Sequence, residues 1–433
     1  MRQLFLSIAF FASCYISAQK MVPISKAEVL KNVQKGNQSL QITSKETQMA
    51  QADYDQSKAI FLPNITASHT GIYTTNALMA FGSKLNQEIL TQADFNPALL
   101  NDPDGTRNFA TKIEIQQPLI NVDGFYKRKA AKTKMEATSL KTQRTKDYLE
   151  FEVNKAYMQL QLTHKAVEVL KKALKTANAN KELAQNNLEQ GYMQESDMLL
   201  VNVRVTEIKN QLFSAKSNVK NASNYLSFLM NRNENIVYQP TDELNVETLS
   251  VENLSVSNNR SDIKAMELAT KAYEDMTKAD KMSFLPRLNA FGSYELYDDK
   301  IFQGNANGYL VGVQLKWDIF KGGQRFGKLD KSQAEFEKSK LEYEQYVSKS
   351  QLELNKAKRM LSDASNKLEL TELAVKQSKE ALRIRENRFK EGLEKPTDLL
   401  MAETKYAQKQ LEYYQTMFEY NYAKSYVEFL TKN

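Results

Sequence analysis

The sequence Leu188-Glu189-Gln190-Gly191 is followed by Asp197, and the related sequence Phe389-Lys390-Glu391-Gly392 is followed by Asp398. In both places the aspartate comes six residues after the glycine. Outward from these points the chain repeats itself further: Phe61-Leu62-Pro63 recurs as Phe284-Leu285-Pro286, and segment 109–120 recurs at 309–320. Each half therefore predicts helix, strand, loop, strand, very long helix, glycine turn and long helix, which is an internally duplicated architecture.

The predicted long helices are the stretches without glycine or proline. The chain has 433 residues but only 14 glycines and 8 prolines. Such stretches, far longer than an average helix of about 11–12 residues, favour extended helical structure. The first of these stretches, segment 125–190, would alone form a helix roughly 100 Å long at 1.5 Å per residue. Four segments contain neither residue: 125–190, 197–230, 328–391 and 397–433.

Apolar residues recur every seven positions in these segments. In the second half the series has no exception, and in the first half only Lys181 interrupts it. A period of 3.5 residues keeps one narrow seam facing a neighbour, which predicts coiled-coil hairpins, with segment 25–58 as a further helix packed beside them. A bare coiled-coil scaffold would show the same seams. The two series are Val153, Leu160, Val167, Leu174 and Leu188, and Val347, Leu354, Leu361, Leu368, Val375, Leu382 and Phe389.

Charge and the N-terminus indicate an exported protein. The net charge of +7 is interspersed along the helices, which is typical of a solvated helix surface and not of a nucleic-acid site. Arg2 precedes an apolar stretch that ends near Ile16-Ser17-Ala18, so residues 1–18 are predicted to be a signal peptide. The only cysteine, Cys14, would leave with it; the alternative is a lipoprotein in which Cys14 is lipidated. After residue 18 no apolar run is long enough for a transmembrane helix.

Four segments alternate between apolar and polar residues instead: 61–75, 109–120, 284–298 and 309–320. Alternation predicts strands with one apolar and one wet face, and each segment has the length that a tilted strand needs to cross an outer membrane. Tyr294, Tyr309 and Trp317 would lie in aromatic girdles, whereas His69 falls on the apolar side and fits less well. A half-buried sheet packed on helices remains the alternative.

Four strands are too few for a closed barrel, for which about eight are needed. Open strand edges in lipid would leave backbone groups unpaired, at several kcal/mol each. If the strands cross a membrane, the chain must therefore oligomerise, and three copies would supply a barrel of twelve strands.

At this point the sequence resembles the TolC family of outer-membrane efflux proteins, across nearly the whole mature chain. The resemblance rests on the duplicated plan, the Phe-Leu-Pro junctions, Trp317-Asp318-Ile319-Phe320-Lys321-Gly322-Gly323, and Phe81-Gly82-Ser83-Lys84-Leu85-Asn86-Gln87, similar to the family's first extracellular loop. It implies a mainly α fold with membrane β-structure: coiled-coil hairpins forming an α-barrel tunnel, and four strands per chain in a trimeric 12-stranded β-barrel.

The same resemblance implies a function. The chain would be the trimeric exit duct of a tripartite efflux or type I secretion system in the outer membrane of a Gram-negative bacterium, with its helices in the periplasm. Its partners would be further copies of itself, a periplasmic adaptor (membrane fusion) protein, an inner-membrane transporter and outer-membrane lipid. The alternative is a soluble periplasmic coiled-coil adaptor or scaffold. The expected organisation is a first repeat at 19–230, a linker at 231–260 and a second repeat at 261–433.

The resemblance places the periplasmic tip at 191–197 and 392–398. Gly191, Tyr192, Gly392 and Leu393 would form the tip and dock the adaptor, while Asp197, Asp398 and Glu394 are candidates for lining the pore entrance. The plainer interpretation of the two aspartates is helix N-capping. Some relatives lock the tip with a tyrosine and an arginine where this chain has Phe389 and Glu394, so that lock is not expected here.

Enzymatic interpretations find little support. Residues 322–328 match G-x-x-x-x-G-K, but Leu329 stands where a phosphate-binding loop needs Ser or Thr, so a turn before a helix is expected. His69 and His164 are the only histidines, and a mature chain without cysteine lacks the usual nucleophile and zinc ligands. No catalytic residue, cofactor site or metal site is predicted.

Overall fold

The computed structural model describes residues 21–233, 236–246 and 254–432, so the predicted signal peptide and Cys14 lie outside the described residues. The chain forms two compact units. The first draws on Met1–Thr43, Gln143–Arg260 and Ser348–Asn433, and the second on Ser44–Thr142 and Ser261–Val347. Each unit therefore combines segments from both sequence repeats.

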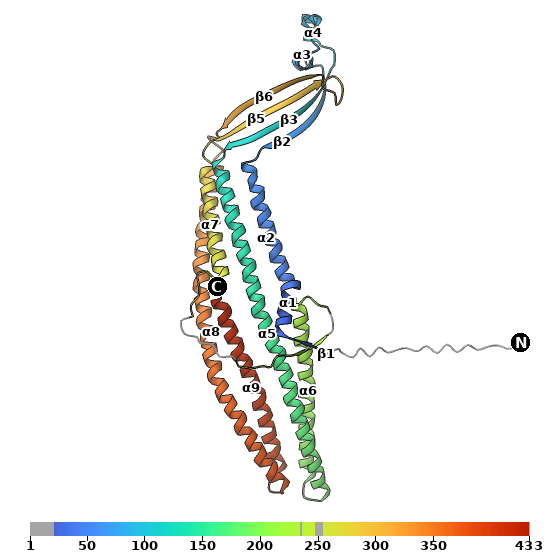
Figure 1. Cartoon of the computed structure of the whole chain (residues 1–433), viewed down its shortest axis with the longest axis vertical. Helices are drawn as coiled ribbons and strands as arrows, with labels where there is room; N and C mark the ends of the chain where they lie inside the picture. The colour runs from blue at the N-terminus through green and yellow to red at the C-terminus, as the bar shows by residue number, and fades with distance from the viewer. Residues whose placement is uncertain (1–20, 234–235, 247–253, 433) are drawn as a thin grey trace, which may run out of the picture. The chain divides into compact units, whose positions relative to one another are not determined.

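The predicted long helices are confirmed. Helix α5 (Val122–Glu189, 68 residues) is followed by α6 (Glu195–Leu229), and α8 (Gln324–Lys390, 67 residues) by α9 (Pro396–Thr431). Each pair forms a hairpin with a short turn (Figure 1). The seven-residue seams are the buried sides of these helices. Members with at most 8% of their surface exposed are Val153, Leu160, Leu354, Leu361, Leu382 and Phe389.

The predicted helix at 25–58 is interrupted at Asn37. Helix α1 (Lys26–Gly36) ends there because Asn37 adopts an extended conformation (ψ 125°), and α2 (Gln38–Gln56) begins at the next residue. The Asn37 side chain accepts a hydrogen bond from the backbone N–H of Ser39 (2.9 Å) and donates one to the carbonyl of Leu229 (2.9 Å). Asn37 thus caps α2 and ties it to the end of α6.

A small parallel sheet, which the sequence patterns did not predict, also lies in the first unit. Strand β1 (Met21–Ile24) pairs with β4 (Val237–Pro240), which lies within the stretch 231–260 that we interpreted as a linker. The Tyr157 hydroxyl of α5 is 3.0 Å from the Ile24 carbonyl and 2.8 Å from Asp242 Oδ2. These hydrogen bonds fasten the sheet to the first hairpin.

The second unit contains an antiparallel four-stranded sheet in the order β2-β3-β5-β6 (Figure 1). Its pairing places the apolar positions of all four strands on one face, as the alternation predicts. One row across the sheet is Ile65, Ile115, Gly292 and Val311, and the next is Ala67, Ile113, Tyr294 and Tyr309. The strands are β2 (Asn64–Thr74), β3 (Thr106–Ile120), β5 (Arg287–Asp298) and β6 (Ala306–Lys316).

Three of the four strands, β2, β5 and β6, are shorter at one end than the alternation suggests. Strand β6 ends at Lys316, so Trp317 and Ile319 lie in the connection to α8. The Trp317 indole N–H donates to the Phe284 carbonyl (3.0 Å), which ties this connection to the Phe-Leu-Pro segment between α7 (Ser261–Met282) and β5. The short helices η1 (Ser57–Ile60), α3 (Ala77–Asn86), η2 (Gln92–Phe95) and α4 (Pro97–Asn101) complete the second unit.

No helix within the described residues is both long enough and apolar enough to span a bilayer.

Candidate functional site

The first helix turn, at Gly191, is built from backbone hydrogen bonds. The N–H of Tyr192 donates to the Asn187 carbonyl (2.8 Å) and that of Gly191 to Leu188 (3.0 Å), the two bonds of a Schellman motif. Gly191 has φ +79°, and a Cβ there would meet no atom within 4 Å. Glycine is therefore required by the backbone conformation and not by crowding. Tyr192 beside it is 81% exposed.

The second turn repeats this geometry. Leu393 N–H donates to the Arg388 carbonyl (2.9 Å) and Gly392 N–H to Phe389 (3.1 Å), and Gly392 has φ +71°. Leu393 is 66% exposed. Both turns thus present one glycine in the left-handed region and one exposed apolar side chain immediately after it.

Ion pairs distinguish the second turn. The Glu394 side chain is only 6% exposed and is paired with both Arg388 (Nε to Oε2, 2.9 Å) and Arg385. Arg385 Nη1 also lies 3.8 Å from Asp398 Oδ2. Hydrogen bonding to Arg388 is the main reason that the pKa of Glu394 lies below its ordinary value. Two of the three candidate entrance carboxylates therefore belong to one charge network inside the second hairpin.

Neither Asp197 nor Asp398 is an N-cap, so the capping interpretation is wrong. The cap residues are Gln194 for α6 and Lys395 for α9, and neither makes a side-chain capping hydrogen bond. Asp197 and Asp398 lie one turn later, in the first turn of each helix. A carboxylate there is still favoured by the helix dipole, by about 0.3–1 kcal/mol when exposed.

The two hairpins meet near their turns. A buried cluster of Ala184, Met198 and Val201 in the first hairpin is covered by Leu400 of α9. On the other side, Leu382, Phe389 and Leu399 of the second hairpin pack with Leu183 of α5. Phe389 is thus a core residue with 4% exposure.

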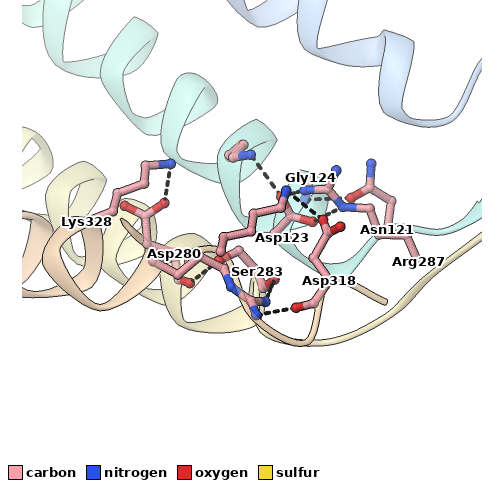
Figure 2. Close-up of polar contacts among 11 residues, drawn as sticks. Asn121, Asp123, Gly124, Asp280, Ser283, Arg287, Asp318 and Lys328 are labelled. Atoms are coloured by element: carbon pink, nitrogen blue, oxygen red, sulfur yellow. Dashed lines mark hydrogen bonds and ion pairs between the residues drawn. The ribbon is translucent and has the colours of Figure 1, made fainter. Parts of the chain in front are cut away.

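A second polar cluster, in the other compact unit, lies where the strands join the helices (Figure 2). Asp123 at the start of α5 is 2% exposed and accepts hydrogen bonds from Arg287 (3.0 and 2.7 Å) and Lys127 (2.8 Å). Burial alone would raise the pKa of Asp123, but these donors outweigh it and the pKa is lowered. Asn121 Oδ1 accepts the Gly124 N–H (3.1 Å), so Asn121 caps α5.

The G-x-x-x-x-G-K segment belongs to the same cluster and is a turn followed by a helix, as expected. Gly322 and Gly323 have φ +57° and +79°, and α8 begins at Gln324. Lys328 lies 2.7 Å from the buried Asp280, so its ammonium group is already paired (Figure 2). Arg325 donates to the carbonyls of Ser283 (3.3 Å) and Ile319 (2.9 Å) and to that of Asp318. Within the described ranges, no group of three or more His, Cys, Asp or Glu side chains could hold a metal ion.

Sequence reasoning missed the partners of the charged candidates. Arg385 and Arg388 lie near the C-terminal end of α8, where basic residues are favoured by the helix dipole. Their position was the one signal in the sequence that could have indicated them as partners of the carboxylates at the second turn. The pairing of Asp123 with Arg287 joins residues 164 positions apart, and no local pattern indicates it.

Comparisons with known proteins agree with the fold. The family model described as "Outer membrane efflux protein" matches residues 29–232 and 255–428. Among solved structures, Campylobacter jejuni CmeC outer membrane channel has a TM-score of 0.81 at 15% identity, covering 94% of this chain and 85% of that chain. The outer membrane protein VceC of Vibrio cholerae has a TM-score of 0.79 at 16% identity, covering 94% of this chain and 95% of that chain. The open MtrE channel of Neisseria gonorrhoeae has a TM-score of 0.78 at 18% identity, covering 94% of this chain and 88% of that chain. No curated protein matches.

The chain belongs to the outer membrane efflux protein family, because the family model covers most of its length. The description of this family gives outer-membrane efflux as the function of the chain and the outer membrane as its location. The fold has duplicated long hairpins and a four-stranded sheet, which does not favour the soluble adaptor that we considered.

Proposed function

We propose that three copies of this chain form one continuous exit duct, in which the strands close a twelve-stranded barrel. The observation that carries the proposal is the sheet itself. Its outer strands β2 and β6 each pair on one side only within the described residues, and one face is apolar. In hydrocarbon, each unpaired backbone group would cost several kcal/mol, so the edges must be paired by other strands.

The direction of the edge strands suits closure by further copies. Because all three pairings are antiparallel, β2 and β6 run in opposite directions. Strand β6 of one copy can then pair antiparallel with β2 of the next, which keeps the barrel antiparallel throughout. Side chains on the apolar face are exposed in the single chain: Ile65, Ile113, Ile115, Tyr294, Tyr309, Val311, Val313 and Leu315.

The helical hairpins offer a second unpartnered surface. Apolar residues on α6 and α8 lie opposite the buried seams and are 45–72% exposed in one chain. On an isolated soluble helix such stripes would be unfavourable, so neighbouring copies are their expected cover. The stripe residues are Leu199, Val203, Phe213 and Phe228 on α6, and Leu352, Leu370, Leu373 and Ile384 on α8.

The turns at Gly191 and Gly392 would form the periplasmic entrance. The exposed Tyr192 and Leu393 are suited to bind a periplasmic adaptor, and an inner-membrane transporter would complete the system. Asp197, Glu394 and Asp398 would surround the entrance, with Glu394 and Asp398 partly neutralised by Arg385.

Cysteine cross-linking tests the trimeric barrel. Asn64 begins β2 and Lys316 ends β6, so both lie at the same end of the sheet, whereas Ala306 lies at the other end of β6. Asn64→Cys with Lys316→Cys should yield covalent trimers in the outer-membrane fraction after oxidation. The matched pair Asn64→Cys with Ala306→Cys should not. A mature protein that remains monomeric in detergent-free buffer, or equal cross-linking by both pairs, would contradict the proposal.

A further inference from the structure

Glu403 is a buried carboxyl group at the contact between the two hairpins. It lies on α9, its residue is 6% exposed, and it accepts a hydrogen bond from the Asn180 amide of α5. Its second oxygen, Oε2, has no hydrogen-bond partner among the described residues. Arg204 of α6 is 8% exposed and its Nε is likewise unpartnered in that set. Two polar atoms of opposite character are therefore buried without partners in one region.

Apolar packing keeps water away from this site. Leu399 and Ala407, one turn before and one turn after Glu403, are 2% and 6% exposed. On α5, Ala177 and Ala184 flank Asn180 and are 1% and 0% exposed. A carboxylate in such surroundings is destabilised relative to the neutral acid unless a cation pairs with it directly.

The charged groups around Glu403 do not provide that pairing. Arg204, the nearby cation on α6, donates to Glu207 of its own helix (3.3 Å). Glu386 on α8 is a carboxylate and disfavours a second negative charge, while the group of α5 that binds Glu403 is the neutral amide of Asn180. Burial is the main cause that raises the pKa of Glu403 to about 7, and Asn180 and Arg204 offset it only in part.

We propose that Glu403 is a proton-operated latch: its neutral form holds the two hairpins together near their turns, and its ionised form loosens them. The function that follows for the duct, easier opening of the entrance when the proton is lost, rests on the proposed function above. No part of the latch is supplied by the ion pairs of Glu394, which lie within the second hairpin.

The direction of the pH effect follows from the raised pKa. A carboxyl group with a folded-state pKa of about 7, above its ordinary value of 4.5, favours the packed arrangement at low pH. That contribution is lost as the pH rises through about 7. The hairpin contact should therefore be tight at pH 6 and weakened at pH 8. Carboxylates with lowered pKa values, such as Glu394, lose their contribution only as the pH falls below the ordinary value of 4.5, so they give no change between pH 6 and pH 8.

The first test measures the hairpin contact directly. Spin labels are placed at the exposed positions Gln185 of α5 and Lys405 of α9, in the full-length assembly with one labelled protomer and Cys14→Ser throughout. The distance between the labels should lengthen from pH 6 to pH 8 in the otherwise unchanged protein. Glu403→Gln, which keeps the shape of the neutral acid, should hold the short distance at both values. A distance that is independent of pH, or one that changes equally in Glu403→Gln, would overturn the latch.

The second test measures conduction in planar bilayers. The open probability should rise at least ~10-fold from pH 6 to pH 8, and by less than ~2-fold in Glu403→Gln, because each pH unit near the pKa changes the proton occupancy severalfold. The control Glu182→Gln removes an exposed carboxylate from α5 and should follow the unchanged protein. If the distance between the labels changes with pH but no variant conducts at any pH, the proposed exit duct is contradicted and the Glu403 latch is supported.

Discussion

Arg287 and Asp123 form a two-point ion pair, with Nε 3.0 Å from Oδ1 and Nη2 2.7 Å from Oδ2. Arg287 begins β5 in the second repeat, and Asp123 lies in the first turn of α5 in the first repeat. The pair therefore joins the two repeats where strands give way to helices (Figure 2). A buried carboxylate in one bidentate pair of hydrogen bonds is held in a defined position, which suits a junction that must orient a long helix.

We expect Arg287→Ala to lower the free energy of unfolding by about 1.5–3 kcal/mol, since the buried Asp123 loses two charge-assisted hydrogen bonds. Lys127→Ala is the matched control, because Lys127 makes one hydrogen bond to Asp123 where Arg287 makes two, and it should cost about 1 kcal/mol or less. Denaturant unfolding, followed by circular dichroism in detergent, measures both. If both variants lose the same unfolding free energy, the Arg287 pair contributes no more to stability than the Lys127 pair does.

Acid should weaken this junction. The pKa of Asp123 is lowered in the folded chain, so its contribution is present above the ordinary value of 3.8 and is lost as the pH falls below it. From about pH 5 to about pH 3, the thermal midpoint of the unchanged protein should therefore fall more steeply than that of Asp123→Asn. Parallel pH profiles would contradict the assignment.

The glycine turns should respond to alanine in a direction set by their backbone. Gly392→Ala places a side chain at φ +71° and should cost about 1–2 kcal/mol. Gly327 has equally open surroundings but lies inside α8, so Gly327→Ala should stabilise by about 0.5–1 kcal/mol. Unfolding curves of the two variants give the comparison. Stabilisation by Gly392→Ala would refute the role of the left-handed conformation.

The charge network of the second turn should govern block of the entrance by multivalent cations. Asp398→Ala removes a candidate entrance carboxylate and should weaken block in single-channel recordings. Arg385→Gln should strengthen it, because Glu394 and Asp398 then lose a shared cation. If neither substitution changes block, Asp398 only supports the start of α9 through the helix dipole.

Adaptor binding should depend on the exposed side chains of the turns. Tyr192→Ala and Leu393→Ala together should lower adaptor affinity at least ~10-fold, as expected for apolar residues at the centre of an interface. Leu78→Ala on α3 is a control of matched exposure, at 82% against 81% for Tyr192. Pull-down with the adaptor from the same organism measures the effect. An unchanged affinity in the double variant would place docking elsewhere on the hairpins.

Local periodicity was sufficient for the main elements of the fold. The seven-residue seam placed Val153, Leu160 and Leu354 on the buried side, and each is fully buried. Alternation likewise placed Ile65 and Ile115 on one face, where they are paired neighbours. Both patterns are visible because helix and strand geometry repeat at fixed intervals along the chain.

Patterns failed where one side chain interrupts a regular element. The break at Asn37 depends on a hydrogen bond to the Leu229 carbonyl, 192 residues away. Strand β6 ends at Lys316, and the indole of the next residue, Trp317, binds the carbonyl of Phe284, 33 residues away. The parallel pairing of β1 with β4 is equally non-local and too short for a periodic signal.

By itself the sequence determined the duplicated order of elements, the glycine turns and the apolar faces, because these follow from the spacing of residues along one segment. Only the tertiary structure decided the charged partners: that Arg385 and Arg388 hold Glu394, that Arg287 holds Asp123, and that Glu403 is buried against Asn180. Whether a carboxylate is exposed, paired or buried depends on the neighbouring element, and packing alone brings that element beside it.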